Sequence, residues 1–117
     1  MPVSIVVGGQ FGSEGKGKVA LHLARARDAA AVVRSAGTNS GHKAHDSHGR
    51  LHAFRQFPAS GLYTPADIVL PAGALIDPEI LLREIDTLPH GRARVRIDPQ
   101  ASVIAPEDRV AEADLVR

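Results

Sequence analysis

Apolar residues occur in short runs along the chain, separated by glycine, proline and polar residues. The first run, residues 3–7, predicts a buried strand, and residues 31–34 and 67–70 predict two more. Residues 16–27 carry apolar positions among alanine and basic residues in a pattern typical of a helix. Strand, helix and strand over residues 3–34 have the length of one βαβ unit.

Turn residues divide the next part of the chain. Residues 35–50 are polar and contain glycine, which indicates a loop or the end of a hairpin, whereas residues 51–57 alternate partly, like an edge strand. A second helix is predicted over residues 78–88, because Asp77 can cap it and Pro78 suits its first position. The apolar stripe expected on one face of this helix consists of Ile80, Leu81, Glu84, Ile85 and Leu88.

Residues 89–117 are predicted to form one more strand and one more helix. Pro89 and Gly91 end the second helix, and residues 92–97 alternate basic and apolar positions like a strand with one solvated face. Residues 106–117 are helical in pattern and lack a glycine cap, as expected of a chain that has been cut. We therefore predict an α/β fold, a mostly parallel sheet with flanking helices, in which residues 1–117 form an incomplete part of a larger domain.

Composition excludes several classes of function. The net charge of +1 and the aromatic content of 3% provide neither the basic field nor the stacking platform of a nucleic-acid-binding protein. Cysteine is absent, which excludes disulfides and thiolate metal sites. No apolar segment is long enough to span a bilayer and no signal peptide precedes the first strand, so we expect a cytoplasmic protein without a membrane partner.

Residues 8–18, which read GGQFGSEGKGK, join the first strand to the first helix. The spacing G-x-x-x-x-G-K of a phosphate-binding loop is met from Gly12 to Lys18, although Val19 stands where such loops have a hydroxyl for magnesium. In this interpretation the N–H groups of residues 15–18 hold phosphoryl oxygens and the lysines neutralise their charge. The alternative is a tight structural turn, in which four glycines are costly in chain entropy.

A second polar cluster, residues 37–43, follows the second predicted strand. If the two strands are parallel neighbours, this cluster reaches the same sheet edge as the first loop, and His42 becomes a candidate acid or donor to a phosphoryl oxygen. Glu14, unusual beside an anion, is expected to accept a hydrogen bond from a ribose, a base or a backbone amide.

Three histidines recur at intervals of three, His42, His45 and His48. Three imidazoles and an open position can make a catalytic zinc site, which is one interpretation of this spacing. In a loop, however, this spacing does not ensure that the three imidazoles point the same way. The alternative is that His45 and His48 are solvated.

These motifs resemble the adenylosuccinate synthetase family. That family opens with a strand and the segment G-x-Q-[WF]-G-D-E-G-K-G-K, which residues 8–18 follow with one departure. Arg34 with residues 39–42 is similar to its Arg before N-x-G-H, and residues 58–61 are similar to its P-S-G turn with an extra alanine. Residues 77–88 resemble its D-P-x-x-L-x-x-E-I-x-x-L helix. The resemblance covers all 117 residues but only the amino-terminal part of a family with much longer members.

The resemblance implies a GTP-dependent, magnesium-dependent ligase that joins aspartate to IMP in purine nucleotide biosynthesis and is a homodimer at full length. It implies a magnesium contact at the Gly41 carbonyl and a general acid at His42, and places Lys43 where the family usually has threonine. The nucleotide-contacting residues expected on this basis are Gly12, Ser13, Glu14, Gly15, Lys16, Gly17, Lys18, Asn39, Ser40, Gly41, His42 and Lys43.

Ser13 is the departure, because it occupies the place of the family's catalytic aspartate, which is both base and magnesium ligand. A hydroxyl is a poorer base and a weaker ligand. Three explanations stay open: a synthetase acting on dGMP, as in the phage branch that makes 2-aminoadenine precursors; a homologue that binds nucleotides without chemistry; or replacement by another acid such as Glu14. A histidine-based metal protein is a further hypothesis. By resemblance, the residues that read guanine and bind aspartate lie beyond Arg117, so we expect the isolated chain to be inactive.

Overall fold

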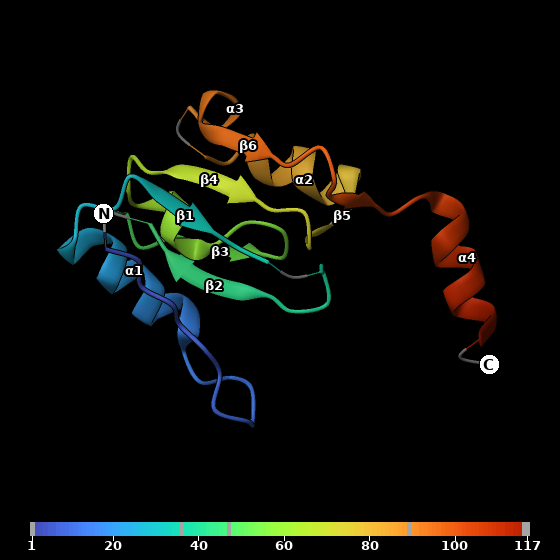
Figure 1. Cartoon of the computed structure of the whole chain (residues 1–117), viewed down its shortest axis with the longest axis horizontal. Coiled ribbons are helices and arrows are strands. Elements are labelled where there is room, and N and C mark those ends of the chain that lie inside the picture. Colours follow the sequence, from blue (N-terminus) through green and yellow to red (C-terminus); the bar gives the residue numbers. More distant parts are fainter. Residues whose placement is uncertain (1, 36, 47, 89, 116–117) are drawn as a thin grey trace.

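The computed structural model describes residues 2–35, 37–46, 48–88 and 90–115, and Figure 1 shows their arrangement. The α-helices in the described part of the chain are α1 (Lys16–Ala26), α2 (Pro78–Ile85), α3 (Gly91–Arg94) and α4 (Pro106–Leu115), with a short 3₁₀ helix, η1 (Ala59–Leu62). The strands are β1 (Ala31–Val33), β2 (His42–His45), β3 (Leu51–Phe54), β4 (Asp67–Leu70), β5 (Leu75–Ile76), β6 (Val95–Ile97) and β7 (Ser102–Val103).

A parallel sheet of order β1–β4–β6 forms the centre of the molecule (Figure 1). Its register aligns Val32 with Ile68 and Ile68 with Val95, so that β4 is bonded on both sides. β5 and β7 form a second parallel pair, and β2 and β3 form an antiparallel hairpin. The predicted α/β class with a mostly parallel sheet is confirmed.

The core surrounds β4. Ile68 and Leu70 of this strand are fully buried, together with Phe54 and Phe57. α1 packs against η1 and the hairpin, and α2 starts where it was predicted, because the Asp77 side chain accepts the N–H groups of its first turn. The observed bounds of α1 and α2 fall within a few residues of the predicted ones.

The amino-terminal apolar run is not a strand, which corrects one prediction. Residues 3–7 run outside the sheet, and Val3, Ile5 and Val7 are 82%, 81% and 78% exposed. The segment passes α1, where Ser4 Oγ accepts a hydrogen bond from Arg27 at 2.9 Å (Figure 1). An extended run becomes a strand only where a neighbouring strand bonds its N–H and C=O groups, and within the described residues none does. The βαβ unit predicted over residues 3–34 is therefore absent.

The basic stretch after α2 is also not one solvated strand. Its first half is the short helix α3, and the strand begins only at Val95. The Arg94 guanidinium is turned inward onto the carbonyl oxygens of Gly61, Thr64 and Ala66 at 2.6–3.1 Å. Pro89, expected to end α2, lies outside the described residues.

The polar stretch of residues 35–50, expected to be a loop or a hairpin end outside the core, contains the loop after β1, strand β2 and the turn to β3, and Ala44 of β2 belongs to the core. None of the described helices is long and apolar enough to cross a membrane.

Candidate functional site

The glycine-rich loop leads directly into the first turn of α1. Gly12, Ser13 and Gly15 have positive φ angles of 66°, 47° and 75°, a conformation that glycine adopts freely and that serine adopts rarely. α1 then begins at Lys16 with no side chain capping its amino terminus. The N–H of Lys18 already donates to Gly15 O at 2.9 Å, which corrects its expected role, so the earlier N–H groups of this end of α1 are the ones suited to an external anion.

Glu14 closes the loop on itself. Its carboxylate accepts the backbone N–H groups of Gly9 and Gln10 at 2.8 and 2.9 Å, and it pairs with Lys16 Nζ at 2.8 Å. The hydrogen bond from Lys16 and the backbone hydrogen bond from Gln10 lower the pKa of Glu14 to about 2. A carboxylate this acidic is a weak base near neutral pH, which argues against Glu14 replacing the missing aspartate. Of the three acceptor roles expected for Glu14, the structure shows bonding to backbone amides.

His42 faces the first turn of α1 from the start of β2. A Cβ added to Gly17 would lie 3.2 Å from His42 Nδ1, a tight contact that the imidazole could relieve only by shifting a few tenths of an ångström. Burial lowers the pKa of His42 below its ordinary value, and the positive charges of Arg34 and Lys16 lower it further. The imidazole is therefore neutral near pH 7 and offers one N–H donor. The two polar clusters found in the sequence meet at this point.

Arg34 holds the loop that leads to His42. This residue is 8% exposed, and its guanidinium donates to Phe57 O at 3.0 Å, to Ser40 O at 2.7 Å and to Ser40 Oγ at 3.2 Å. Asn39 and Ser40 are exposed on this loop, and Lys43 points outward from β2. The loop therefore presents its polar side chains on a backbone that is anchored from within.

The three histidines do not gather. His42 and His45 lie three residues apart in β2, so they point to opposite faces of the hairpin. Asp46, which directly follows His45, accepts the N–H groups of His48 and Arg50 and pairs with His52 at 3.1 Å. Over the described part of the chain, no group of three His, Cys, Asp or Glu side chains is placed to hold a metal ion. The zinc hypothesis has no support in this geometry.

The magnesium contacts implied by resemblance, Ser13 and the Gly41 carbonyl, are both neutral oxygens. Protein sites for Mg²⁺ use one or two carboxylates together with water and phosphate oxygens. The nearest carboxylate in the loop, that of Glu14, is engaged by two amides and a lysine. These donors by themselves do not fit a magnesium site.

An open cavity of about 640 Å³ lies beside residues 37–39 of the loop after β1. Thr38 and Asn39 line it, together with Asp77 at the start of α2 and Arg109 of α4. Residues 12–18 are not among its lining residues. The glycine-rich loop therefore forms no part of this cavity.

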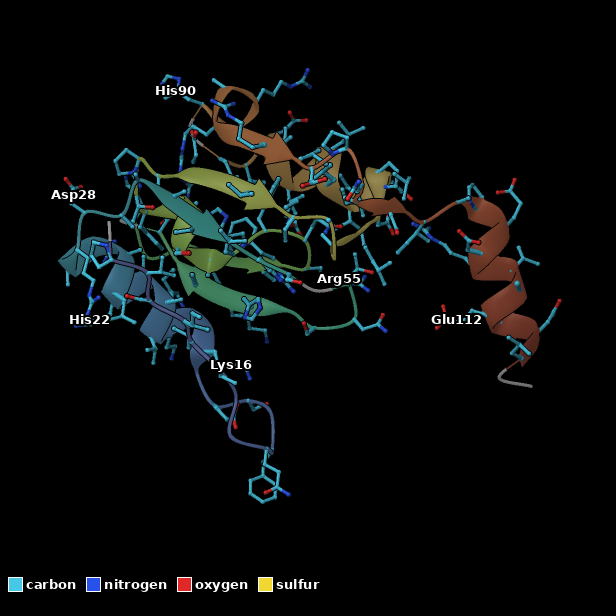
Figure 2. All side chains as sticks on the ribbon, viewed as in Figure 1. Lys16, His22, Asp28, Arg55, His90 and Glu112 are labelled. Atoms are coloured by element: carbon cyan, nitrogen blue, oxygen red, sulfur yellow. The ribbon has the colours of Figure 1, made fainter. Side chains whose placement is uncertain are left out.

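Sequence reasoning assigned no site role to two residues: Arg55, which contacts the loop after β1, and Glu84, which contacts residues 55–57. Figure 2 shows Arg55 near the loop after β1, and its Nε donates to Thr38 O at 2.9 Å. No motif marks Arg55. Glu84 carried two signals: it is an acidic residue within the apolar stripe of α2, where it needs buried partners, and it is the E of the D-P-x-x-L-x-x-E-I-x-x-L pattern.

Comparison with known proteins gives consistent matches. Residues 5–114 match the family model described as adenylosuccinate synthetase. The chain is 37% identical over 112 residues to the adenylosuccinate synthetase of Pyrococcus sp. (strain ST700), covering 93% of this chain and 33% of that protein. It is 34% identical over 108 residues to that of Archaeoglobus fulgidus, covering 92% and 32%. The chain thus spans about a third of the length of the curated relatives it matches.

Solved structures agree in fold. The fully ligated adenylosuccinate synthetase of Plasmodium falciparum superimposes with a TM-score of 0.81 at 24% identity, over 93% of this chain and 26% of that one. The succinoaminodeoxyadenylate synthetase of cyanophage S-2L, bound to dGMP and to dATP as energy donor, superimposes with a TM-score of 0.71 at 29% identity. That match covers 90% of this chain and 30% of the phage protein.

Proposed function

The chain belongs to the adenylosuccinate synthetase family, and on this premise we propose that residues 1–117 are the nucleotide-binding part of a ligase joining aspartate to a purine nucleotide. In the proposed reaction the γ-phosphoryl group of GTP moves to the 6-oxygen of the purine and GDP leaves. The amino nitrogen of aspartate then displaces that oxygen as phosphate. The chain's own contribution is to bind and orient the phosphate groups.

The observation that carries this proposal is the contact between Gly17 and His42. It places the His42 imidazole beside the first turn of α1, which no side chain caps, and we propose that donors of the turn and of the imidazole bind the same phosphate group. Phosphoryl oxygens accept from such N–H groups, and Lys18 adds positive charge on the first turn. His42 is kept as the proposed general acid on the family resemblance, and proton transfer requires its imidazolium form; as a neutral imidazole its single N–H donates a hydrogen bond to a phosphoryl oxygen.

We propose dGMP rather than IMP as the purine substrate. Ser13 is smaller than the family's aspartate and carries no charge, which leaves room for the 2-amino group that dGMP has and IMP lacks. The similarity to a phage synthetase bound to dGMP supports this choice.

Titration calorimetry tests both parts of the proposal. The chain is titrated with dGMP, IMP and GTP at one magnesium concentration, and we expect dGMP to bind at least about tenfold more tightly than IMP. Ser13→Asp should reverse the preference, whereas Ser4→Asp, a matched change outside the loop, should leave it unchanged. A folded chain that binds none of the three nucleotides overturns the proposal.

A second candidate, nucleotide binding without chemistry, is favoured by one observation: the loop holds no free base. Ser13 is a hydroxyl and Glu14 has a pKa of about 2. Turnover separates the candidates once this chain is joined to a family member's remaining two thirds, with phosphate release measured in the presence of aspartate and dGMP. Phosphate release by the parent sequence supports the ligase. Phosphate release only by the Ser13→Asp variant supports nucleotide binding without chemistry. The 117-residue chain alone should release none.

A further inference from the structure

Glu84 binds a run of backbone far from it in sequence. It lies on the inward face of α2 and is 8% exposed. Its carboxylate accepts the N–H group of Arg55 at 2.5 Å, that of Gln56 at 3.0 and 3.2 Å, and that of Phe57 at 2.8 Å. Three consecutive amides thus converge on one buried charge. Hydrogen bonds to a charged acceptor are stronger than neutral ones, so segment 55–57 is firmly held.

The held segment in turn holds the loop of residues 38–42 at two points. Arg55 donates through Nε to Thr38 O at 2.9 Å. Phe57 O accepts from Arg34 Nη1 at 3.0 Å, and the same guanidinium donates through Nη2 to Ser40 O at 2.7 Å. The two anchored carbonyls, of Thr38 and Ser40, lie on either side of Asn39.

The charges along this path complement one another. Arg34 is buried, which lowers its pKa, and the negative charge of Glu84 acts in the opposite direction. Phe57 lies between the two charged groups, donating its N–H to Glu84 and accepting from Arg34 through its carbonyl. Without the carboxylate, three N–H groups lose an ionic acceptor and the buried guanidinium loses a compensating charge.

We propose that Glu84 is a positioning residue for the nucleotide-contacting loop, residues 38–42, which it orders through segment 55–57, Arg34 and Arg55. Glu84 touches no nucleotide in this arrangement. The assignment of a nucleotide to the loop rests on the proposed function; the ordering of the loop does not.

The first experiment measures loop order without a ligand. Backbone ¹⁵N relaxation is compared for the parent chain, Glu84→Gln and Glu79→Gln, the same change at an exposed position of α2. In Glu84→Gln we expect order parameters of residues 38–40 to fall from about 0.85 to below about 0.6, while β4 stays rigid. Arg34→Met should loosen the same residues, and the double variant should loosen them no further, because both changes interrupt one path.

The second experiment measures binding. Glu84→Gln should weaken dGMP binding by at least about tenfold, because the loop must be ordered before it can bind. Inorganic pyrophosphate probes the glycine-rich loop alone, and its affinity should change less than about twofold. Glu79→Gln should change neither.

Distinct results overturn the two proposals. A loop that stays ordered in Glu84→Gln, or a whole chain that loosens equally, overturns the positioning role. A parent chain that binds no nucleotide while Glu84→Gln still loosens the loop overturns the proposed function and leaves the positioning role supported. If Glu84→Gln does not fold, Arg34→Lys, which cannot bond both carbonyls at once, is measured in its place.

Discussion

At the scale of single residues, the first turn of α1 is shaped by two short contacts. Because Gly17 has no side chain, His42 can lie close to the helix. The Glu14 carboxylate binds the N–H groups of Gly9 and Gln10, as an external anion otherwise would. We expect both contacts to affect the geometry of the site more than the stability of the fold.

Gly17→Ala should separate these two effects. The added Cβ would meet His42 Nδ1 at 3.2 Å and push the imidazole away, so dGMP affinity should fall about tenfold. Alanine favours the helix over glycine, so the free energy of unfolding should change by no more than about 1 kcal/mol. Gly9→Ala is the control, because its Cβ would make only an ordinary contact at 3.5 Å. Unchanged affinity in Gly17→Ala would show that the imidazole plays no part in binding.

The Glu14 contacts predict an acid transition confined to the loop. The pKa of this carboxyl is lowered from 4.5 to about 2 in the folded chain, so its contribution is complete above pH 4.5 and is lost as the pH falls towards 2. The amide proton shifts of Gly9 and Gln10, followed by NMR, should move with a midpoint near 2. Glu14→Gln should abolish the transition. A midpoint near 4.5 would mean that the carboxylate is free in solution.

At the scale of elements, arginines hold the connections between strands. Arg94 bonds the carbonyl of Gly61 within η1 and those of Thr64 and Ala66 after it, and so fixes the chain just before β4 enters the sheet. Arg92, two residues earlier, pairs only loosely with Asp86 at 3.5 Å on the surface. The same residue type thus serves two different purposes within one turn.

Arg94→Met should therefore destabilise the chain much more than Arg92→Met. Loss of the bonds to buried carbonyls should cost about 1–3 kcal/mol, whereas an exposed pair should cost less than about 0.5 kcal/mol. Urea denaturation followed by circular dichroism measures both values. If both variants lose the same free energy of unfolding, Arg94 is solvated, as the alternating pattern of residues 92–97 predicted.

At the scale of the molecule, apolar surface is distributed unevenly. The core around β4 is closed, but the amino-terminal segment exposes alternate large side chains, and α4 buries none of its described residues. In Figure 1 both segments extend from the sheet, the first beside α1 and the second at the opposite side. The stability of the folded chain therefore comes from residues between them.

Polar replacement at both kinds of position tests this distribution. The triple variant Val3→Thr, Ile5→Thr and Val7→Thr should change the free energy of unfolding by less than about 0.5 kcal/mol, because these side chains are already exposed. Ile68→Ala should cost about 2–5 kcal/mol, because its side chain is fully buried. Because the triple variant exposes less apolar surface, it should also self-associate less than the parent chain, as measured by analytical ultracentrifugation. A cost equal to that of Ile68→Ala would show that the segment is buried in solution.

Much of the candidate site was predictable, because its motifs are local. Glycines and lysines in a short interval indicate an anion site at a helix start, and Asp77 with Pro78 indicates where α2 begins. The meeting of Gly17 with His42 was predicted only by assuming neighbouring parallel strands. It occurs through the hairpin instead, because the segment before the loop pairs with no described strand.

The sequence by itself determined the elements whose signals lie within one or two turns: the starts of α1 and α2, and the apolar strand β4 at the centre of the sheet. Only the tertiary structure decided which partners the polar groups of those elements bind. Glu84 and Arg94 reach partners 27–33 residues away, and these contacts depend on which elements pack together. The same holds for residues 3–7, whose apolar pattern specifies a strand only when a neighbour bonds its backbone. Local propensity selects an element, but the burial of charges and backbone groups is settled only by packing.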